Sequence, residues 1–279
     1  MKKHNATLLP TLLVFAAVMV TGCTTPEGRS TADTDTIADA LAVGMSPLAK
    51  KLRRETLDVL PSKPKGNHLF DIYDPQSHSA WARNWTRKLD FTGVAWDNTR
   101  TATLVSPRHV VMAGHYVRKP GETVIFHNRR GKRIVRILTA IKKLPNADIA
   151  VGLLESEAPV TFYRVLAPSD SHSKTLIGAL GFVTDQKRQL YVHEIRSASI
   201  VAVAFNHSPS IHKAWRKFLI AGDSGNPSFL LVDDELLLLG THSTGGAGAG
   251  PFYSSPEVIA SLNATMSELG GGYQLSIAE

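Results

Sequence analysis

Three side chains of this sequence could act together as a nucleophile, a base and a carboxylate partner. His115 follows an apolar run, Asp148 precedes another, and Ser224 lies between Gly222 and Gly225. A serine hydroxyl is a weak nucleophile until a neighbouring base accepts its proton. Histidine suits that role near neutral pH, and a carboxylate can orient its ring. These are the residue types that nucleophilic catalysis by a serine requires.

The local sequences around these residues resemble the trypsin/chymotrypsin-like serine proteases. Residues 104–115 read LVSPRHVVMAGH, residues 146–151 read NADIAV, and residues 221–227 read AGDSGNP. The matching family segments are approximately LIS-x-x-x-V-L-T-A-A-H, D-I-A-L-L and G-D-S-G-G-P, in the same order along the chain. The resemblance covers about residues 90–265.

The resemblance implies a role for each residue of this set. Ser224 would attack a peptide carbonyl, His115 would carry the proton, and Asp148 would orient His115. The backbone N–H groups of Gly222 and Ser224 would form the oxyanion hole. No metal or organic cofactor is implied. Zinc binding by His115, His109 and Asp148 is an alternative, but no HExxH or paired Cys/His spacing supports it.

The resemblance also implies where a substrate would bind. Ser243 would lie near Asp148, while Thr244 and Gly245 would pair with an extended peptide by strand addition. The alternative is an ordinary buried strand. Phe218 stands six residues before Ser224, where trypsin-like members carry an acid, so we expect an apolar pocket with Phe218 at its base.

Two departures from the family pattern bear on activity. Asn226 replaces the second glycine after the serine, and no Ile-Val-Gly-Gly activation site precedes the first lobe. In the family, the amine freed at such a site pairs with the aspartate before the serine, which is Asp223 here. The rival prediction is therefore an inactive protease-fold module that binds a peptide or an envelope polymer.

Short β-like runs separated by turn residues must position these side chains. The pattern predicts an all-β fold, which by resemblance has two six-stranded antiparallel barrels. We expect a first lobe over residues 86–157 and a second over 158–279, ending in a helix that begins at Pro256. The runs that predict strands are FTGVAWD, TATLVS, HVVMAG, ETVIFH, KRIVRILTAI, DIAVGLLE, RVLAP, LIGALGFV, QLYVHEI, ASIVAVAF, FLIAG, SFLLV and LLLLGTHS.

The amino-terminal region resembles a bacterial lipoprotein leader. Residues 1–22 predict a signal peptide, because a basic start precedes an apolar run that ends in small residues before Cys23. Cys23 would carry the lipid and anchor the protein to the cell envelope, on the periplasmic face of the outer membrane. An uncleaved anchor helix is the alternative. Residues 23–85 would form a tether and an extension, with helix-like spacing over 37–60.

Composition narrows the partner classes. The 279 residues are 43% hydrophobic and 20% charged, which excludes disorder of the whole chain. The net charge of +7 favours anionic surfaces weakly, and the single cysteine excludes an intramolecular disulfide.

A basic hairpin at 129–136 suggests either a nucleic-acid or lipid patch or a solvated edge, and we favour the edge. We expect a peptide substrate and a membrane as partners, and no nucleic acid; the oligomeric state is not indicated.

Overall fold

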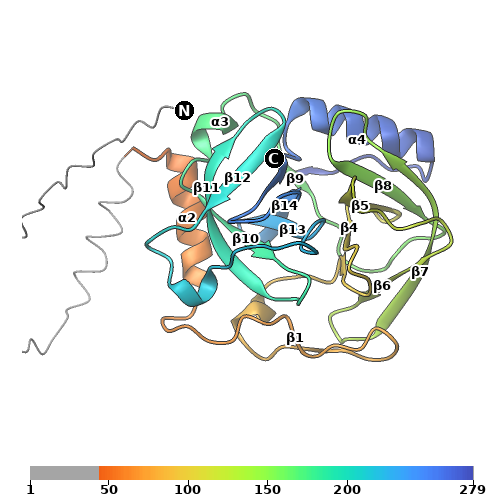
Figure 1. Ribbon diagram of the computed structural model, residues 1–279, viewed down its shortest axis with the longest axis horizontal. Coiled ribbons are helices and arrows are strands. Elements are labelled where there is room, and N and C mark those ends of the chain that lie inside the picture. Colours follow the sequence, from red (N-terminus) through yellow and green to blue (C-terminus); the bar gives the residue numbers. More distant parts are fainter. Residues whose placement is uncertain (1–43, 279) are drawn as a thin grey trace, which may run out of the picture. The chain divides into compact units, whose positions relative to one another are not determined.

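Two six-stranded antiparallel sheets dominate the computed structural model, which describes residues 44–278. Figure 1 shows the two sheets side by side, with a helix running along the outside of each. The predicted fold class is confirmed: the chain is mostly β, with two barrel-like sheets and a carboxy-terminal helix. The predicted signal peptide and lipidated Cys23 lie outside the described residues. No helix within 44–278 is long and apolar enough to cross a membrane.

The first sheet has the strand order β3-β4-β5-β8-β7-β6. Its strands are β3 (Val94–Ala95), β4 (Ala102–Leu104), β5 (His109–Ala113), β6 (Thr123–His127), β7 (Arg133–Lys143) and β8 (Ile149–Leu154). The second sheet has the order β14-β13-β10-β11-β12-β15. Its strands are β10 (Leu180–Thr184), β11 (Leu190–Ala198), β12 (Ala202–Asn206), β13 (Pro227–Val232), β14 (Glu235–Thr241) and β15 (Ala249–Pro251).

Arg118 closes the first sheet between its edge strands β3 and β6. Its guanidinium donates hydrogen bonds to the carbonyl oxygens of Ala95 in β3, at 3.3 Å, and of Thr123 in β6, at 2.9 Å. It also binds both carboxylate oxygens of Asp97 at 2.9 Å and the carbonyl of Arg100 at 2.8 Å. One buried side chain thereby satisfies backbone groups that an open sheet would leave unpaired.

Two hairpin turns follow the turn residues of the sequence. Asp233 and Asp234 join β13 to β14 with φ angles of 49° and 66°. Positive φ at both central residues suits the right-handed twist of a two-residue hairpin, and aspartate tolerates it. Between β6 and β7, the Asn128 side-chain oxygen accepts hydrogen bonds from the backbone N–H groups of Arg130 and Lys132, each at 3.0 Å. The basic hairpin expected at 129–136 is thus confirmed as a hairpin, and a second one joins β13 to β14.

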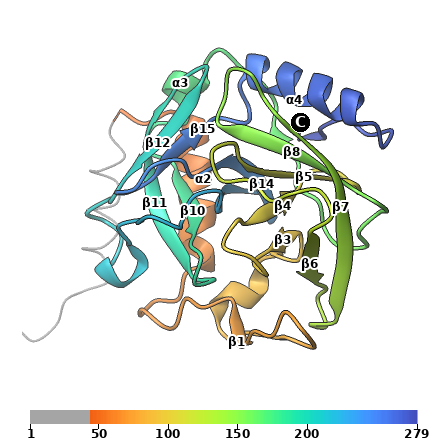
Figure 2. The same ribbon diagram turned by 45° about the vertical axis from the view of Figure 1, so that its right-hand side comes forward.

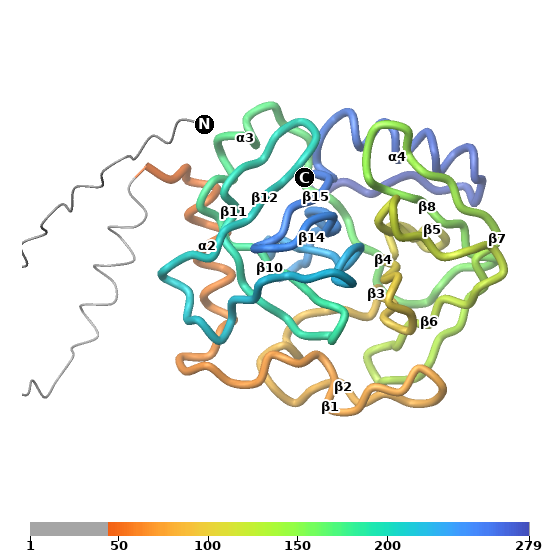
Figure 3. The backbone as a smooth tube through the Cα atoms, in the orientation of Figure 1, coloured from red at the N-terminus to blue at the C-terminus, as the bar shows by residue number. Residues whose placement is uncertain are grey.

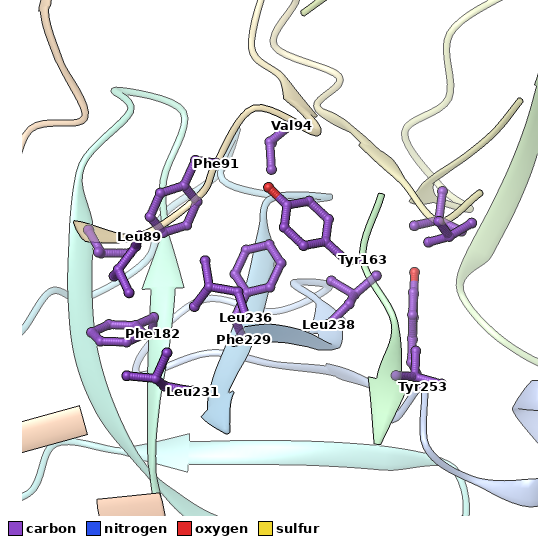
Figure 4. Packing of buried hydrophobic residues seen from close by; sticks show 14 of the residues in the cluster. Leu89, Phe91, Val94, Tyr163, Phe182, Phe229, Leu231, Leu236, Leu238 and Tyr253 are labelled. Atoms are coloured by element: carbon purple, nitrogen blue, oxygen red, sulfur yellow. The ribbon is translucent and has the colours of Figure 1, made fainter. Parts of the chain in front are cut away.

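The largest hydrophobic cluster draws residues from both sheets, so their docking is part of the core. Figure 4 shows its aromatic centre, where Phe91, Tyr163, Phe182 and Phe229 pack together. The rings of Tyr163 and Phe229 lie 4.7 Å apart between centroids. Burial alternates along the strands: Phe182 faces this cluster, whereas Val183 faces a second cluster on the opposite side of β10.

Helix α2 (Pro47–Val59) covers that second face of the second sheet. The Ser46 side chain accepts a hydrogen bond from Ala49 N–H, and Pro47 occupies the first turn, which together fix where the helix begins. Fully buried Leu52 packs into the second cluster, and Arg53 forms an ion pair with Glu194 at 3.0 Å. Figure 2 shows α2 against the second sheet. The helix-like spacing is thus confirmed for 47–59.

The segment between α2 and the first sheet passes under both sheets, as the tube in Figure 3 shows. It contains the short strands β1 (Phe70–Ile72) and β2 (Ala80–Trp81) and the 3₁₀ helix η1 (Trp85–Lys88). Phe70 and Trp81 stack with ring centroids 4.1 Å apart. Residues such as Leu69 and Trp85 belong to the largest core cluster, so this extension is part of the folded domain.

The carboxy-terminal helix α4 (Pro256–Leu269) begins at the N-cap Ser255 and ends at Gly270, as expected, and it packs on β7 and β8. After it, β16 (Ile277–Ala278) pairs in parallel with β9 (Val165–Leu166), and the short helices α3 (His172–Thr175) and η2 (Lys213–Trp215) complete the elements.

The predicted strand FLIAG at 218–222 is wrong. These residues form a loop in which only Leu219 makes a β-bridge, with Gly246.

Candidate active site

The register between β5 and β8 brings His115 to Asp148. Ala113, the last residue of β5, pairs with Ile149, the first residue of β8. His115 lies two residues beyond the end of β5, and Asp148 lies one residue before β8 begins. Gly114 passes so close that an added Cβ would lie 3.1 Å from the Asp148 carboxylate. A larger residue would crowd the carboxylate, so the close approach favours glycine where the two segments cross.

The Asp148 carboxylate accepts three hydrogen bonds. Its Oδ1 accepts from the backbone N–H of His115 at 2.8 Å, and its Oδ2 accepts from His115 Nδ1 at 2.7 Å. The Ser243 hydroxyl donates to the same Oδ2 at 2.5 Å. Because a carboxylate only accepts, the proton on His115 belongs at Nδ1, which leaves Nε2 as the basic nitrogen. Within residues 44–278, His115 Nε2 makes no hydrogen bond, and half of the side chain is exposed.

Backbone contacts bring the loop that carries Ser224 close to the end of β5, which His115 follows. Gly225 N–H donates to the carbonyl of His242 at 2.8 Å, and His242 N–H donates to the carbonyl of Asn226 at 3.0 Å. Gly225 also lies against Ala113, where an added Cβ would be 3.3 Å from the backbone nitrogen. The loop with Ser224 is thus held between the end of β5 and the strand that leads to Ser243. Ser224 is partly buried, and its hydroxyl makes no hydrogen bond inside the described chain.

Among the described residues, the backbone N–H groups of Gly222 and Ser224 have no acceptor. Asp223 N–H, between them, closes a turn onto the carbonyl of Ile220 at 3.0 Å. Gly222 has φ +95°, a conformation that side chains rarely allow, and it directs the chain through this turn. Neither flanking N–H donates to any residue within 44–278, so both are available to an oxyanion.

Asp223 is buried and has partners of its own. Its carboxylate accepts hydrogen bonds from Ile220 N–H at 2.9 Å and from Gln186 N–H at 3.2 Å. The ammonium of Lys217 lies 3.2 Å from Asp223 Oδ2. The sequence did not predict a partner for Asp223, because Lys217 reaches it only after the loop has folded.

Asn226 ties the serine loop to the first sheet. Its side-chain oxygen accepts from Trp96 Nε1 at 3.1 Å and from the Thr101 hydroxyl at 3.2 Å. Its amide nitrogen donates to the carbonyl of Asp223 at 3.1 Å. The sequence identified Asn226 only as a departure from the family pattern. No local signal indicated these partners, because they lie 125 and 130 positions away; once buried, an asparagine needs partners for both ends of its amide.

The residues predicted to bind substrate lie on two facing segments. Ser243 contacts Asp148, as expected, and the exposed Thr244 and Gly245 follow it. Gly245 N–H donates no hydrogen bond within the described residues, so an extended peptide can pair with it. Phe218 does not lie at the base of a pocket: its side chain is 71% exposed and packs edge-on against His207.

Two other buried histidines lie behind this site. His193 Nδ1 donates to the Ala247 carbonyl at 2.7 Å, and His242 Nε2 is buried without a partner among residues 44–278. Burial lowers the pKa of His193 to about 3 and that of His242 to about 4, because the protonated rings would lose hydration. Both rings are therefore neutral in the fold.

We expect the free energy of unfolding to decrease as the pH falls from 6.5 towards 4. The unfolded chain binds protons at these histidines in that range, whereas the folded chain does not, so acid favours unfolding. Each of the two histidines lowers the free energy of unfolding by about 1.4 kcal/mol for each pH unit below its unfolded pKa. Denaturant titrations at several pH values give the free energy of unfolding as a function of pH. Between pH 6.5 and 4 this free energy should fall less steeply in His242→Gln than in the wild type, whereas exposed His78→Gln should keep the wild-type pH dependence. An unchanged slope in His242→Gln would contradict this account.

The basic hairpin uses several of its charges internally. Arg129 forms an ion pair with Asp90 at 3.1 Å, Arg133 donates to the Pro75 carbonyl at 2.8 Å, and Arg136 donates to the Glu157 carbonyl. These contacts favour the structural interpretation of the hairpin. No group of three or more His, Cys, Asp or Glu side chains in the described region could hold a metal ion.

No family model matches the chain, and no curated protein is significantly similar to it. The two six-stranded antiparallel sheets are consistent with a double-barrel fold. The candidate site therefore has to be judged on its own geometry.

Proposed function

We propose that the protein is a serine endopeptidase that hydrolyses peptide bonds through an acyl-enzyme on Ser224. The observation that carries this proposal is the Asp148 carboxylate, which binds His115 Nδ1 at 2.7 Å and the Ser243 hydroxyl. His115 and Asp148 lie at the ends of strands of the first sheet, and Ser243 lies two residues after the end of β14 in the second sheet. Ser243 fixes the Asp148 carboxylate, and the carboxylate in turn fixes the His115 ring with Nε2 free, which is the arrangement that a general base requires.

The chemistry follows from the donors and acceptors. Ser224 Oγ attacks the substrate carbonyl carbon while His115 Nε2 accepts the hydroxyl proton. The carbonyl oxygen becomes an oxyanion and accepts hydrogen bonds from the N–H groups of Gly222 and Ser224. Collapse breaks the C–N bond, and His115 gives its proton to the leaving amine. Water, deprotonated by His115, then hydrolyses the ester and restores Ser224.

We propose that the substrate is a protein or peptide with an apolar side chain at the cleaved position. Its backbone would pair with Thr244 and Gly245, whereas Phe218 and Ile220, exposed by 71% and 56%, offer apolar contacts before the nucleophile. A hollow of about 190 Å³ on the segment that precedes β8 is lined partly by apolar residues; its lining comprises Leu144, Asn146, Ala147, Ile200, Val201, Glu257, Val258 and Ser261. Cleavage of a peptide library mainly after arginine would contradict this preference.

Lipidation of Cys23 and attachment to the bacterial cell envelope, on the periplasmic face of the outer membrane, remain part of the proposal. They rest on the leader sequence alone, since residues 1–43 lie outside the described structure. Labelling of the intact chain with a radioactive fatty acid, abolished by Cys23→Ala, is the direct test.

A serine-reactive fluorophosphonate tests the catalytic proposal. We expect it to label the folded protein covalently and stoichiometrically, and we expect Ser224→Ala to abolish the label. Exposed Ser173→Ala is the matched control and should label like the wild type. Intact mass and peptide mapping identify the modified residue. A folded protein without Ser224-dependent label would instead favour the inactive binding module, which holds a peptide without cutting it.

A further inference from the structure

The ammonium group of Lys217 lies between two buried carboxylates. Its Nζ is 2.6 Å from Asp185 Oδ2 and 3.2 Å from Asp223 Oδ2. Both aspartates are almost fully buried, with side-chain exposures of 0% and 1%, and Lys217 is 17% exposed. Buried carboxylates are costly unless a counter-charge and hydrogen bonds compensate them. Lys217 is the single cation that serves both carboxylates within the described chain.

The backbone of Lys217 is fixed on both sides, so its side chain has a defined direction. Its N–H donates to His193 Nε2 at 3.2 Å, and its carbonyl accepts from His207 Nε2 at 2.8 Å. The ring of Tyr191 lies 5.7 Å from Nζ on the remaining side. The ammonium is therefore held in place before any ligand binds.

The carboxylate that Lys217 holds also shapes the oxyanion loop. Asp223 Oδ2 accepts from Ile220 N–H, and Asp223 N–H donates back to the Ile220 carbonyl, which closes the turn in both directions. The two unpaired N–H groups, on Gly222 and Ser224, flank this one residue. A rotation of the Asp223 side chain would break the bond from Ile220 N–H, leave the turn closed by its backbone bond alone, and so loosen the hold on both donors.

We propose that Lys217 is a built-in positioning residue that holds the oxyanion loop in its active conformation. The inference rests on the proposed function and adds its regulation: the protein needs no newly cleaved amino terminus to become active. The resemblance implies a freed amine as the partner of this aspartate, and Lys217 Nζ supplies the same chemical group from within the domain. The loop is then active as soon as the domain has folded.

The rate of fluorophosphonate labelling of the full chain tests this role. We expect Lys217→Met to slow labelling about 100-fold or more, the effect of losing one oxyanion donor. Lys217→Arg should restore much of the rate, because it returns a cation to the two carboxylates. Lys213→Met, which changes an exposed lysine at the start of η2, is the matched control and should label like the wild type. Thermal melts establish that each variant is folded.

A second variant addresses the risk that Lys217→Met fails to fold. Lys217→Met combined with Asp185→Asn leaves only the Asp223 carboxylate, which keeps its two backbone donors. The proposal is overturned if either folded variant labels as fast as the wild type. It is also overturned if the wild type labels only after a cut upstream of the first sheet, as intact mass would show. A wild type that never labels contradicts the proposed function itself.

Discussion

Replacement of Asp148 by asparagine is expected to lower kcat for peptide hydrolysis about 10⁴-fold. The Asp148 carboxylate accepts hydrogen bonds from three donors, two on His115 and one on Ser243. An asparagine amide has one accepting end only, so its NH₂ group must face a donor or select the other tautomer of His115. In that tautomer the proton sits on Nε2, which can no longer accept the proton of Ser224.

The measurement compares kcat for a cleaved peptide in Asp148→Asn and in the control Asp58→Asn, which changes an exposed carboxylate on α2. Thermal melts of both variants exclude a general loss of structure. A folded Asp148→Asn protein that keeps kcat within tenfold of the wild type would show that His115 is not oriented through this carboxylate.

Replacement of Arg118 by methionine is expected to destabilise the domain by about 3–5 kcal/mol. The substitution leaves the buried Asp97 carboxylate without its cation and removes donors from the carbonyls of Ala95, Arg100 and Thr123. Each buried acceptor that loses its donor carries its own desolvation cost. Methionine fills much of the volume, so the loss is electrostatic rather than a cavity effect.

Chemical denaturation with a structural probe such as tryptophan fluorescence measures this change. The matched control is Arg83→Met, which breaks an ion pair with Asp71 at an arginine that is 93% exposed. We expect that control to cost less than about 1 kcal/mol. Equal destabilisation by the two variants would show that Arg118 does not close the first sheet.

Local sequence patterns predicted the strands and turns well, because the burial of one or both faces of a strand determines which of its positions are apolar. The run HVVMA forms β5 with all five residues buried, and the basic hairpin expected at 129–136 joins β6 to β7. The run FLIAG was wrongly predicted as a strand for the same reason, because it is apolar. Its apolar residues include Phe218 and Ile220, which lie on an exposed loop, and no local signal separates such a loop from a buried strand.

The partners within the candidate site were harder to predict, because they depend on contacts between distant segments. Ser243 was expected near Asp148, and the hydrogen bond across 95 positions confirms it. Lys217 and Asp185 are 32 positions apart, and nothing in either local sequence indicates their ion pair. Phe218 was misplaced because a residue's distance from Ser224 in sequence does not determine which way a loop side chain turns.

The hydrogen bonds of Asn226 have a consequence for how the protein would fail under stress. His115 and Asp148 move with the first sheet, Ser224 moves with the second, and Asn226 joins them through Trp96 and Thr101. A small separation of the two sheets breaks these bonds while each sheet keeps its own strand pairing. Mild heat or denaturant should then abolish the proposed peptidase activity reversibly, before either sheet loses its own strand pairing.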